Sequence, residues 1–337
     1  MQKLLNEWKR FIEGIDPETD EADFKYYAFD WDDNLMRMPT KILVKDSEGN
    51  EIGISTEEFA HTREYINKAS EEHPYEYNGY NLVGYATNPF RNFRTEGDEQ
   101  FKIDALKAPL VKDSWNAFVE CINSGSYFAI ITARGHKPIT IFEAIKNLID
   151  KNHGGIKKQE LINSLIEREK TIYSEPNLDA DYLLSNYEDK ILEHIYPVSN
   201  EEVASKLGGG SANSPEEAKI IALNMFINDM MKINDNQPIK IGFSDDDKRN
   251  VKHVVEIMSG EGAIPEEVAL SVFYTGPQDK EIPKKQTISK QDSTGDINSL
   301  PPNKKLPRFM ESKNKGNHAL KEGLATKMFR TKSYKQK

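Results

Sequence analysis

Residues 24–34 read FKYYAFDWDDN, an apolar run followed by a cluster of aspartates. Phe24–Phe29 has the length and the aromatic content of a buried strand, so the aspartates emerge where that strand reaches the edge of a sheet. Asp30 and Asp32 point to the same side if the segment stays extended. Two neighbouring carboxylates favour a hard divalent cation. The stretch therefore predicts a strand that carries an acidic site at its end.

Short apolar strands alternate with amphipathic helices through most of the chain. This alternation predicts a mostly parallel sheet with helices on both faces, the doubly wound, Rossmann-like α/β class. Sites in this class form at the carboxyl ends of the strands. The predicted strands are 24–29, 127–132, 194–198, 239–243 and 269–274, and the predicted helices are 112–123, 138–150, 215–227 and 247–258.

Polar residues also follow two further predicted strands. Thr132 ends one apolar run, and Arg134 lies two residues beyond it in a glycine turn. The acidic run Asp245–Asp247 follows the strand 239–243, and its last member is in position to cap the next helix. Because the carboxyl ends of parallel strands meet at one edge of a sheet, we expect these groups to form a single site with the aspartates that follow the first strand.

Taken in order, these residues resemble the motifs of the haloacid-dehalogenase-like superfamily. Asp30-Trp31-Asp32 resembles the first motif, Thr132 the second and Asp245-Asp246 the fourth. The third motif, a lysine at the start of a helix, is best matched by Lys219, which lies between the third and fourth predicted strands. The resemblance covers the α/β core, residues 24–274, and leaves out both ends and two insertions.

This resemblance implies a phosphatase that works through a covalent intermediate. Asp30 would attack a phosphomonoester and form an aspartyl-phosphate, which divides one difficult displacement into two easier ones. Asp32 would protonate the leaving oxygen and later accept a proton from the hydrolytic water. Thr132 and Lys219 would bind the phosphoryl oxygens.

The resemblance also implies a Mg²⁺ cofactor. In this family the ion is held by the carboxylate of the first aspartate, the backbone carbonyl of the second and the acids of the fourth motif. These ligands correspond here to Asp30, Asp32, Asp245 and Asp246. Oxygen ligands of this kind, completed by water, are those that Mg²⁺ prefers. A small phosphorylated substrate and Mg²⁺ are therefore expected at the same site.

Two parts of the site depart from the family pattern. Asn34 stands where the family usually has Thr or Val, and we assign it, with Arg134, to substrate binding, although a loop arginine beside an acidic site could equally balance charge. Ser244 precedes the fourth-motif acids where a glycine is common, and residues 248–250 lack the further acid that is usual there. These departures leave open a non-catalytic scaffold that binds a partner or nucleic acid through its terminal arms.

Two insertions interrupt the predicted core of residues 21–275. Residues 39–108 begin with a β-hairpin pattern and continue into an aromatic segment, whose side chains could line a pocket or pack the insertion itself. Residues 152–190 are helical in pattern, and either insertion could lie over the site. An amphipathic helix is predicted for residues 1–20, and residues 276–337 are predicted to be a mostly disordered tail.

Charge is distributed unevenly along the chain. The formal net charge of −10 combines +9 on residues 301–337, which hold eleven Lys or Arg against two Glu, with −19 on residues 1–300. The acidic body does not suit a broad nucleic-acid surface, whereas the basic tail could contact nucleic acid or protein. The single cysteine, Cys121, excludes an intramolecular disulfide framework. Neither a membrane-spanning run nor a signal-peptide pattern occurs, so we expect a cytoplasmic protein.

The leading hypothesis is therefore a Mg²⁺-dependent phosphomonoester hydrolase that acts on a nucleotide or another small phosphorylated metabolite. The size of the insertion 39–108 favours such a substrate, because a cap of this size can enclose it. The basic tail and the loop around Arg134 favour, as the alternative enzyme, a phosphatase that acts on polynucleotide ends.

Overall fold

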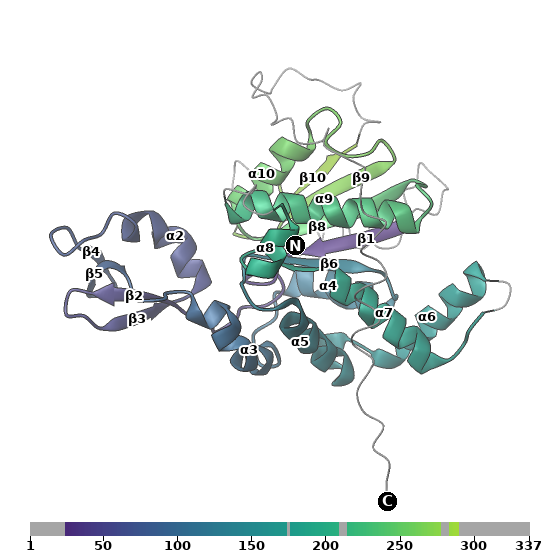
Figure 1. Cartoon of the computed structure of the whole chain (residues 1–337), viewed down its shortest axis with the longest axis horizontal. Coiled ribbons are helices and arrows are strands. Elements are labelled where there is room, and N and C mark those ends of the chain that lie inside the picture. Colours follow the sequence, from purple (N-terminus) through teal and green to yellow (C-terminus); the bar gives the residue numbers. More distant parts are fainter. Residues whose placement is uncertain (1–23, 174–175, 209–213, 278–282, 290–337) are drawn as a thin grey trace, which may run out of the picture. The chain divides into compact units, whose positions relative to one another are not determined.

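A mostly parallel sheet of six strands forms the centre of the structure, a computed structural model that describes residues 24–173, 176–208, 214–277 and 283–289 (Figure 1). Five strands are parallel, and β10 at one edge is antiparallel to its neighbour β9. All five predicted strands are present. The strands are β1 (Phe24–Phe29), β6 (Phe128–Thr132), β7 (Ile195–Pro197), β8 (Ile239–Asp245), β9 (Val268–Tyr274) and β10 (Lys285–Ile288).

Helices cover both faces of this sheet. On one face Tyr27 and Phe29 of β1 pack in a cluster with α4, α5, α6 and α7, and on the other Tyr26 and Ala28 pack with α9 and α10. The two-residue period of a strand produces this alternation, and burial on both faces explains the unbroken apolar runs. The helices are α4 (Lys112–Asn123), α5 (Pro138–Asp150), α6 (Lys158–Ile172), α7 (Ala180–Glu193), α8 (Glu201–Lys206), α9 (Pro215–Ile233) and α10 (Lys248–Met258), with the 3₁₀ turn η3 (His153–Gly155).

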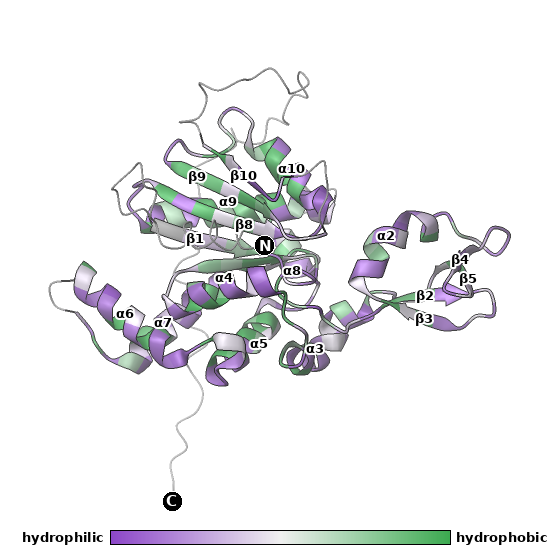
Figure 2. Cartoon of the chain, turned by 180° about the vertical axis from the view of Figure 1, so that it is seen from behind, coloured by the Kyte–Doolittle hydropathy of each residue, from purple (hydrophilic) through white to green (hydrophobic). Residues whose placement is uncertain are grey.

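Hydropathy follows the same arrangement. Figure 2 shows hydrophobic residues along the central strands, whereas the helices carry both hydrophobic and hydrophilic residues. Each large apolar side chain fully buried in such a core stabilises the fold by about 1.5–3 kcal/mol. Within the described ranges, no helix has both the length and the apolar character that crossing a membrane requires.

The order of the strands positions the site. The chain runs from β1 outward through β6 and β7, then returns to place β8 and β9 on the opposite side of β1. The strand order thus reverses between β1 and β8, whose carboxyl ends lie side by side. Ligands bind in open α/β sheets at such a reversal, because the connections from the two strands diverge to opposite faces and leave a crevice.

A smaller antiparallel sheet forms within residues 41–97, which we call the cap. Its strand order is β3-β2-β5-β4, and the hairpin predicted near residue 46 joins its first two strands. A reciprocal capping box starts helix α2: Ser55 Oγ accepts from Glu58 N, and Glu58 Oε2 accepts from Ser55 N. The elements are β2 (Ile42–Asp46), β3 (Glu51–Ile54), α2 (Thr56–Ile66), β4 (Tyr75–Tyr77), β5 (Tyr80–Tyr85), η1 (Arg91–Phe93) and η2 (Thr95–Gly97).

Helix α3 (Asp98–Ala105) falls inside the predicted insertion 39–108 but packs in the core. Phe101 and Ala105 are buried in the same cluster as the residues of α5. The insertion 152–190 also belongs to that face of the core, where Leu165 and Tyr187 are buried. No residue of this second insertion lines the candidate site within the described ranges, so only the cap lies over it.

The prediction of a disordered tail from residue 276 is wrong for Lys285–Ile288. These residues form β10, which pairs with Leu270–Phe273 of β9. An edge strand needs backbone partners more than apolar side chains, and only Ile288 of the four packs against the apolar cluster. The sequence therefore carried almost no hydrophobic signal here. The helix predicted for residues 1–20 and the tail from residue 290 lie outside the described residues.

Candidate active site

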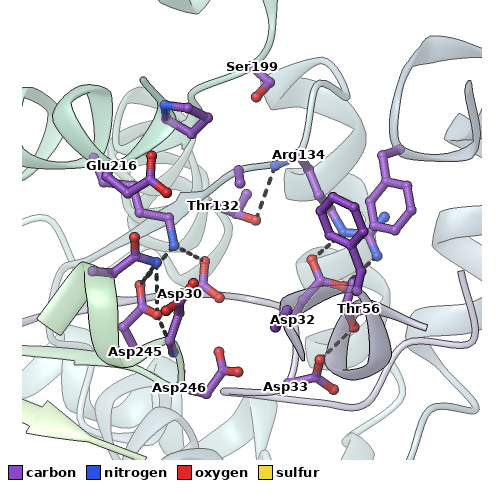
Figure 3. Close-up of a pocket in the computed structure, with 18 of the residues that line it drawn as sticks. Asp30, Asp32, Asp33, Thr56, Thr132, Arg134, Ser199, Glu216, Asp245 and Asp246 are labelled. Atoms are coloured by element: carbon purple, nitrogen blue, oxygen red, sulfur yellow. Dashed lines mark hydrogen bonds and ion pairs between the residues drawn. The ribbon is translucent and has the colours of Figure 1, made fainter. Parts of the chain in front are cut away.

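A cavity of about 400 Å³ lies where the carboxyl ends of β1, β6 and β8 face the cap (Figure 3). Three strand ends and the start of α9 contribute its charged floor. Every residue that we predicted to be catalytic or metal-binding lines this cavity, namely Asp30, Asp32, Thr132, Lys219, Asp245 and Asp246. The tertiary structure thus brings together groups that lie up to 216 positions apart in the sequence, from Asp30 to Asp246.

The two aspartates after β1 face the cavity, as their spacing predicts. Asp30 and Asp32 both line it, whereas Trp31 between them is fully buried and packs on the ring of Phe101, 5.4 Å away. The backbone N–H of Asp30 donates to Ser244 O across the β1–β8 pair, at 3.0 Å. This bond ties the first acidic residue to the adjacent strand end.

Lys219 joins two of the strand ends. Its Nζ atom lies 2.9 Å from Asp30 Oδ1 and 2.8 Å from Asp245 Oδ2, and the residue is only 3% exposed. The side chain reaches this position because Ser214 caps α9, which places Lys219 near the start of the helix on the face toward the sheet. A lone helix lysine is usually solvated, but this one is an internal counter-ion.

The pKa values of these groups are strongly displaced. Burial raises the pKa of Asp30 to about 8, against the opposing effect of Lys219, while nearby Asp245 and Asp32 raise it further. Burial alone would lower the pKa of Lys219, but the two carboxylates outweigh it and raise this pKa above its ordinary value. Displaced values of this kind cluster at sites that do chemistry.

Three carboxylates are close enough to share one cation. The ligand atoms of Asp30, Asp245 and Asp246 lie within 4.8 Å of one another. The Asp246 carboxylate has no hydrogen-bond partner within the described residues, and burial together with Asp245 and Asp30 raises its pKa well above the usual value. One lysine cannot balance three carboxylates, so the donor set fits a hard cation such as Mg²⁺.

Arg134, which we assign either to substrate binding or to charge balance, lines the cavity, but the hydrogen bonds of its guanidinium within the described residues go to protein groups. Its Nε and Nη2 atoms donate to the two oxygens of Asp32, at 2.7 and 2.6 Å, and Nη2 also donates to Thr40. The guanidinium is 1% exposed and lies between the rings of Phe93 and Phe101, 4.6 and 4.8 Å from their centroids. Bidentate pairing and stacking hold Asp32 in one orientation.

His136 and Asp98 continue the chain of contacts that begins at Asp32 and Arg134. Arg134 Nη1 lies 3.1 Å from His136 Nε2, and His136 Nδ1 lies 2.8 Å from Asp98 Oδ1. A guanidinium only donates, so Nε2 is the acceptor and the imidazole proton resides on Nδ1. Burial and the neighbouring Arg134 lower the pKa of His136, against the effect of Asp98. No local sequence pattern pointed to Asp98, because it lies on α3, within the insertion 39–108.

Asn34 is not a substrate-binding residue, contrary to our prediction. Its side chain is fully buried and lies outside the cavity lining. The amide nitrogen donates to Asp30 O and Ser244 Oγ, at 2.9 and 3.0 Å, and the amide oxygen accepts from Thr275 Oγ1 at 2.7 Å. Asn34 and Ser244 therefore pair with each other, and Asn34 links the ends of β1, β8 and β9.

Asn250 orients one of the acidic residues that follow β8. Asn250 Nδ2 donates to both oxygens of Asp245, at 3.1 and 3.0 Å, and thereby fixes that carboxylate. Asp247 caps α10 as predicted, because its Oδ1 atom accepts from Arg249 N at 2.9 Å. Sequence reasoning noted the missing acid but did not identify the role of Asn250.

The cap supplies the opposite wall of the cavity. One face of α2 lines it through Thr56, Phe59, Ala60 and Arg63, whose spacing of three and four residues is that of a helix face. Phe90 and Phe93 from the end of the cap lie beside them. We had predicted that the aromatic residues of segment 75–94 either line a pocket or pack the insertion, and these two do both.

Comparisons of the chain with protein-family models, with curated proteins and with solved structures found no match.

Proposed function

We propose that this protein is a Mg²⁺-dependent phosphomonoester hydrolase of the haloacid-dehalogenase-like superfamily, built on a doubly wound α/β core. The observation that carries the proposal is the buried contact of Lys219 Nζ with Asp30 and Asp245, at 2.9 and 2.8 Å. This lysine offsets two crowded carboxylates and leaves Asp30 facing the cavity. The reversal of strand order between β1 and β8 supports the fold assignment.

Asp30 would act as the nucleophile. Lys219 holds its Oδ1 atom, whereas Oδ2 accepts no hydrogen bond within the described residues. Attack of a carboxylate oxygen on phosphorus forms an aspartyl-phosphate as the bond from phosphorus to the leaving alcohol breaks. Water then attacks that phosphorus, which releases inorganic phosphate and regenerates Asp30. Lys219 and the Thr132 hydroxyl would stabilise the charged oxygens of the transferring group.

Asp32 would supply and recover the proton. The leaving oxygen gains a proton in the first step, and the attacking water loses one in the second. Asp32 faces the cavity two residues from Asp30, and Arg134 orients it through two hydrogen bonds. Arg134 would therefore be a positioning residue, which acts through Asp32 and not on the substrate.

Mg²⁺ would be held by the carboxylates of Asp30, Asp245 and Asp246, together with the backbone carbonyl of Asp32 that the family resemblance implies. The carboxylate of Asp246 is half-buried and has no hydrogen-bond partner within the described residues, which supports this assignment, since an anion partly removed from water is costly unless a cation offsets it. When bound, the ion supplies positive charge that stabilises the transferring phosphoryl group.

The direct test is an assay of phosphate release. Purified protein is expected to liberate inorganic phosphate from members of a panel of nucleotides, sugar phosphates and aryl phosphates when Mg²⁺ is present, and EDTA is expected to stop the reaction. A folded sample that releases no phosphate from any member of the panel with Mg²⁺ would show that the proposed function is wrong.

Metal binding can be tested without activity through the variant Asp246→Asn. In wild type, Mg²⁺ at about 100 times its Kd is expected to stabilise the fold by about 2.7 kcal/mol, which raises Tm by several degrees. The variant is expected to lose this shift. Asp246 accepts no hydrogen bond within the described residues, and its repulsion by Asp245, Asp30 and Asp33 outweighs its attraction to Lys219, so the metal-free Tm of the variant is expected to equal or exceed that of wild type. Differential scanning calorimetry with Mg²⁺ and with EDTA measures both, and an equal Mg²⁺ shift in the two proteins would refute this ligand assignment.

The positioning role of Arg134 predicts a selective loss in Arg134→Lys. A lysine cannot make the bidentate pair, so kcat is expected to fall about 10- to 100-fold with little change in KM. Substrates with poor leaving groups, such as alkyl phosphates, are expected to lose more than aryl phosphates, because only the former depend on a well-placed acid.

The matched control for this substitution is Arg91→Lys in the cap. Arg91 forms a similar fork with Glu51 at the surface, through contacts of 3.1 and 2.5 Å. Exposed pairs contribute little, so kcat is expected to stay near the wild-type value. An Arg134→Lys enzyme that slows alkyl and aryl phosphates equally would argue against action through Asp32.

A further inference from the structure

Helix α2 of the cap spans the cavity between two parts of the core. At its first residue, Thr56 Oγ1 donates to Asp33 Oδ2 at 2.5 Å, in the loop that follows β1. Two turns further along, Arg63 Nη2 lies 3.7 Å from Glu216 at the start of α9. The face between these two contacts, which carries Phe59 and Ala60, is therefore held over the cavity.

This face and the neighbouring cap residues form an aromatic wall. The rings of Phe59 and Phe90 lie 5.7 Å apart in an edge-to-face contact, and Phe93 lies 6.4 Å from Phe90. Phe59 and Phe90 are only half-buried and both line the cavity. The cavity thus has two chemically different sides, a charged floor of aspartates and a wall that offers apolar ring surface.

Polar groups also line the cavity. Phe59 lies three residues, about one helical turn, beyond Thr56, which contacts Asp33 in the loop after β1. The hydroxyl of Ser199 and the carboxylate of Glu216 line the same cavity (Figure 3) and are suitable partners for sugar hydroxyls. A cavity of about 400 Å³ is within the range that encloses a ligand with several rings.

From this arrangement we infer that the substrate is a nucleotide, whose phosphate lies at Asp30 and whose base packs against Phe59 and Phe90. The inference rests on the proposed phosphomonoesterase activity and names its substrate class. The phosphate of a nucleotide matches the charged floor, and its base matches the aromatic wall. The sugar hydroxyls match the polar groups that line the cavity. Every base presents a π-face, so we expect the site to accept nucleotides as a class and not to select one base.

The experiment compares kcat/KM, with Mg²⁺, for a nucleoside monophosphate, ribose 5-phosphate, phenyl phosphate and an oligonucleotide with a terminal phosphate. Wild type is expected to prefer the nucleotide over ribose 5-phosphate by at least about 10-fold, the effect of one base–aromatic contact. In Phe59→Ala this preference is expected to shrink by about 10-fold. Phe59→Leu keeps apolar volume in the cap but removes the ring, and it is also expected to reduce the preference for the nucleotide.

The matched control is Tyr65→Ala, on the same helix. Tyr65 is 57% exposed, lies outside the cavity lining and stacks on Tyr75, so its removal is expected to leave all the kcat/KM values unchanged. The relative rates on the free nucleotide and the oligonucleotide identify which source of nucleotide the site accepts, and a preference for either over ribose 5-phosphate supports the inference.

Two negative outcomes have different meanings. If ribose 5-phosphate or phenyl phosphate is hydrolysed as well as the nucleotides, and Phe59→Ala slows all substrates equally, the nucleotide inference is overturned while the hydrolase proposal stands. If none of the four compounds releases phosphate while Mg²⁺ still raises Tm, the hydrolase proposal itself fails, and the nucleotide inference fails with it.

Discussion

Replacing Asp30 with asparagine is expected to abolish phosphate release, with kcat lowered by about 10⁴-fold or more. The amide that replaces the carboxylate cannot form the aspartyl-phosphate, and it is also a poorer metal ligand. A colorimetric phosphate assay on the best substrate of the panel measures the loss. The effect is expected on kcat at every pH, because no titration restores the missing nucleophile.

The fold is expected to survive this substitution. Asparagine has nearly the size and shape of aspartate, and burial together with Asp245 and Asp32 already raises the pKa of Asp30, so removing its charge relieves repulsion inside the site. Lys219 keeps its contact with Asp245. Circular dichroism and Tm should therefore match those of wild type within a few degrees.

The matched control is Asp33→Asn, three residues further along. Asp33 has a φ of 53°, a conformation that asparagine also adopts readily, and an amide oxygen can still accept from Thr56. Activity is expected to fall by a few-fold at most. Turnover retained in Asp30→Asn, or an equal loss in Asp33→Asn, would remove Asp30 from the role of nucleophile.

Replacing Lys219 with methionine is expected to produce the largest loss of stability. Methionine fills a similar volume but leaves the buried carboxylates of Asp30 and Asp245 without their cation. Removing one partner of a buried ion pair costs about 3–5 kcal/mol. Urea unfolding at pH 8 with EDTA present measures this loss, because the chelator prevents a metal ion from replacing the missing charge.

The loss of stability in Lys219→Met is expected to depend on pH. Without Lys219, the folded-state pKa of Asp30 rises further above its unfolded value, so the folded state holds protons that the unfolded state has lost. A group with a raised folded-state pKa loses stability as the pH rises above its unfolded pKa. The deficit of Lys219→Met relative to wild type is therefore expected to be larger at pH 8 than at pH 5.

The control for this substitution lies on the same helix. Lys232 is 73% exposed and pairs only with Asp229 at the surface, so Lys232→Met is expected to change the free energy of unfolding by less than about 0.5 kcal/mol. A Lys219→Met protein as stable as wild type at pH 8 would mean that the lysine does not compensate these carboxylates.

The sequence determined the five parallel strands of the central sheet, because a strand that is buried on both faces consists of a continuous run of apolar residues. β6 is buried along its whole length, and α4 and α5 begin and end at the predicted residues. The strand-end positions of Asp30, Thr132 and Asp245 followed from that signal alone. Parallel strands must place their carboxyl ends together, so the sequence also predicted that these groups would meet.

Partnerships between side chains were decided only by the tertiary structure. Nothing near Arg134 in the sequence indicates that it pairs with Asp32, 102 positions away, between rings that come from two other segments. The same holds for Asn34, whose distant partners are Ser244 in β8 and Thr275 just after β9. The sequence around a polar loop residue is the same whether its side chain faces a ligand or forms hydrogen bonds with buried backbone groups.

The physical reason is the range of the forces involved. Hydrophobic burial is non-directional and repeats with the period of each element, so a single sequence shows which face of a strand or helix is inside. Hydrogen bonds and close ion pairs need their atoms about 3 Å apart, so they depend on which segments meet, as β10 and the Asp98–His136 contact illustrate. The sequence by itself therefore determined where Asp30 and its neighbours gather, and the packed structure decided which of them face the cavity and which hold the others in place.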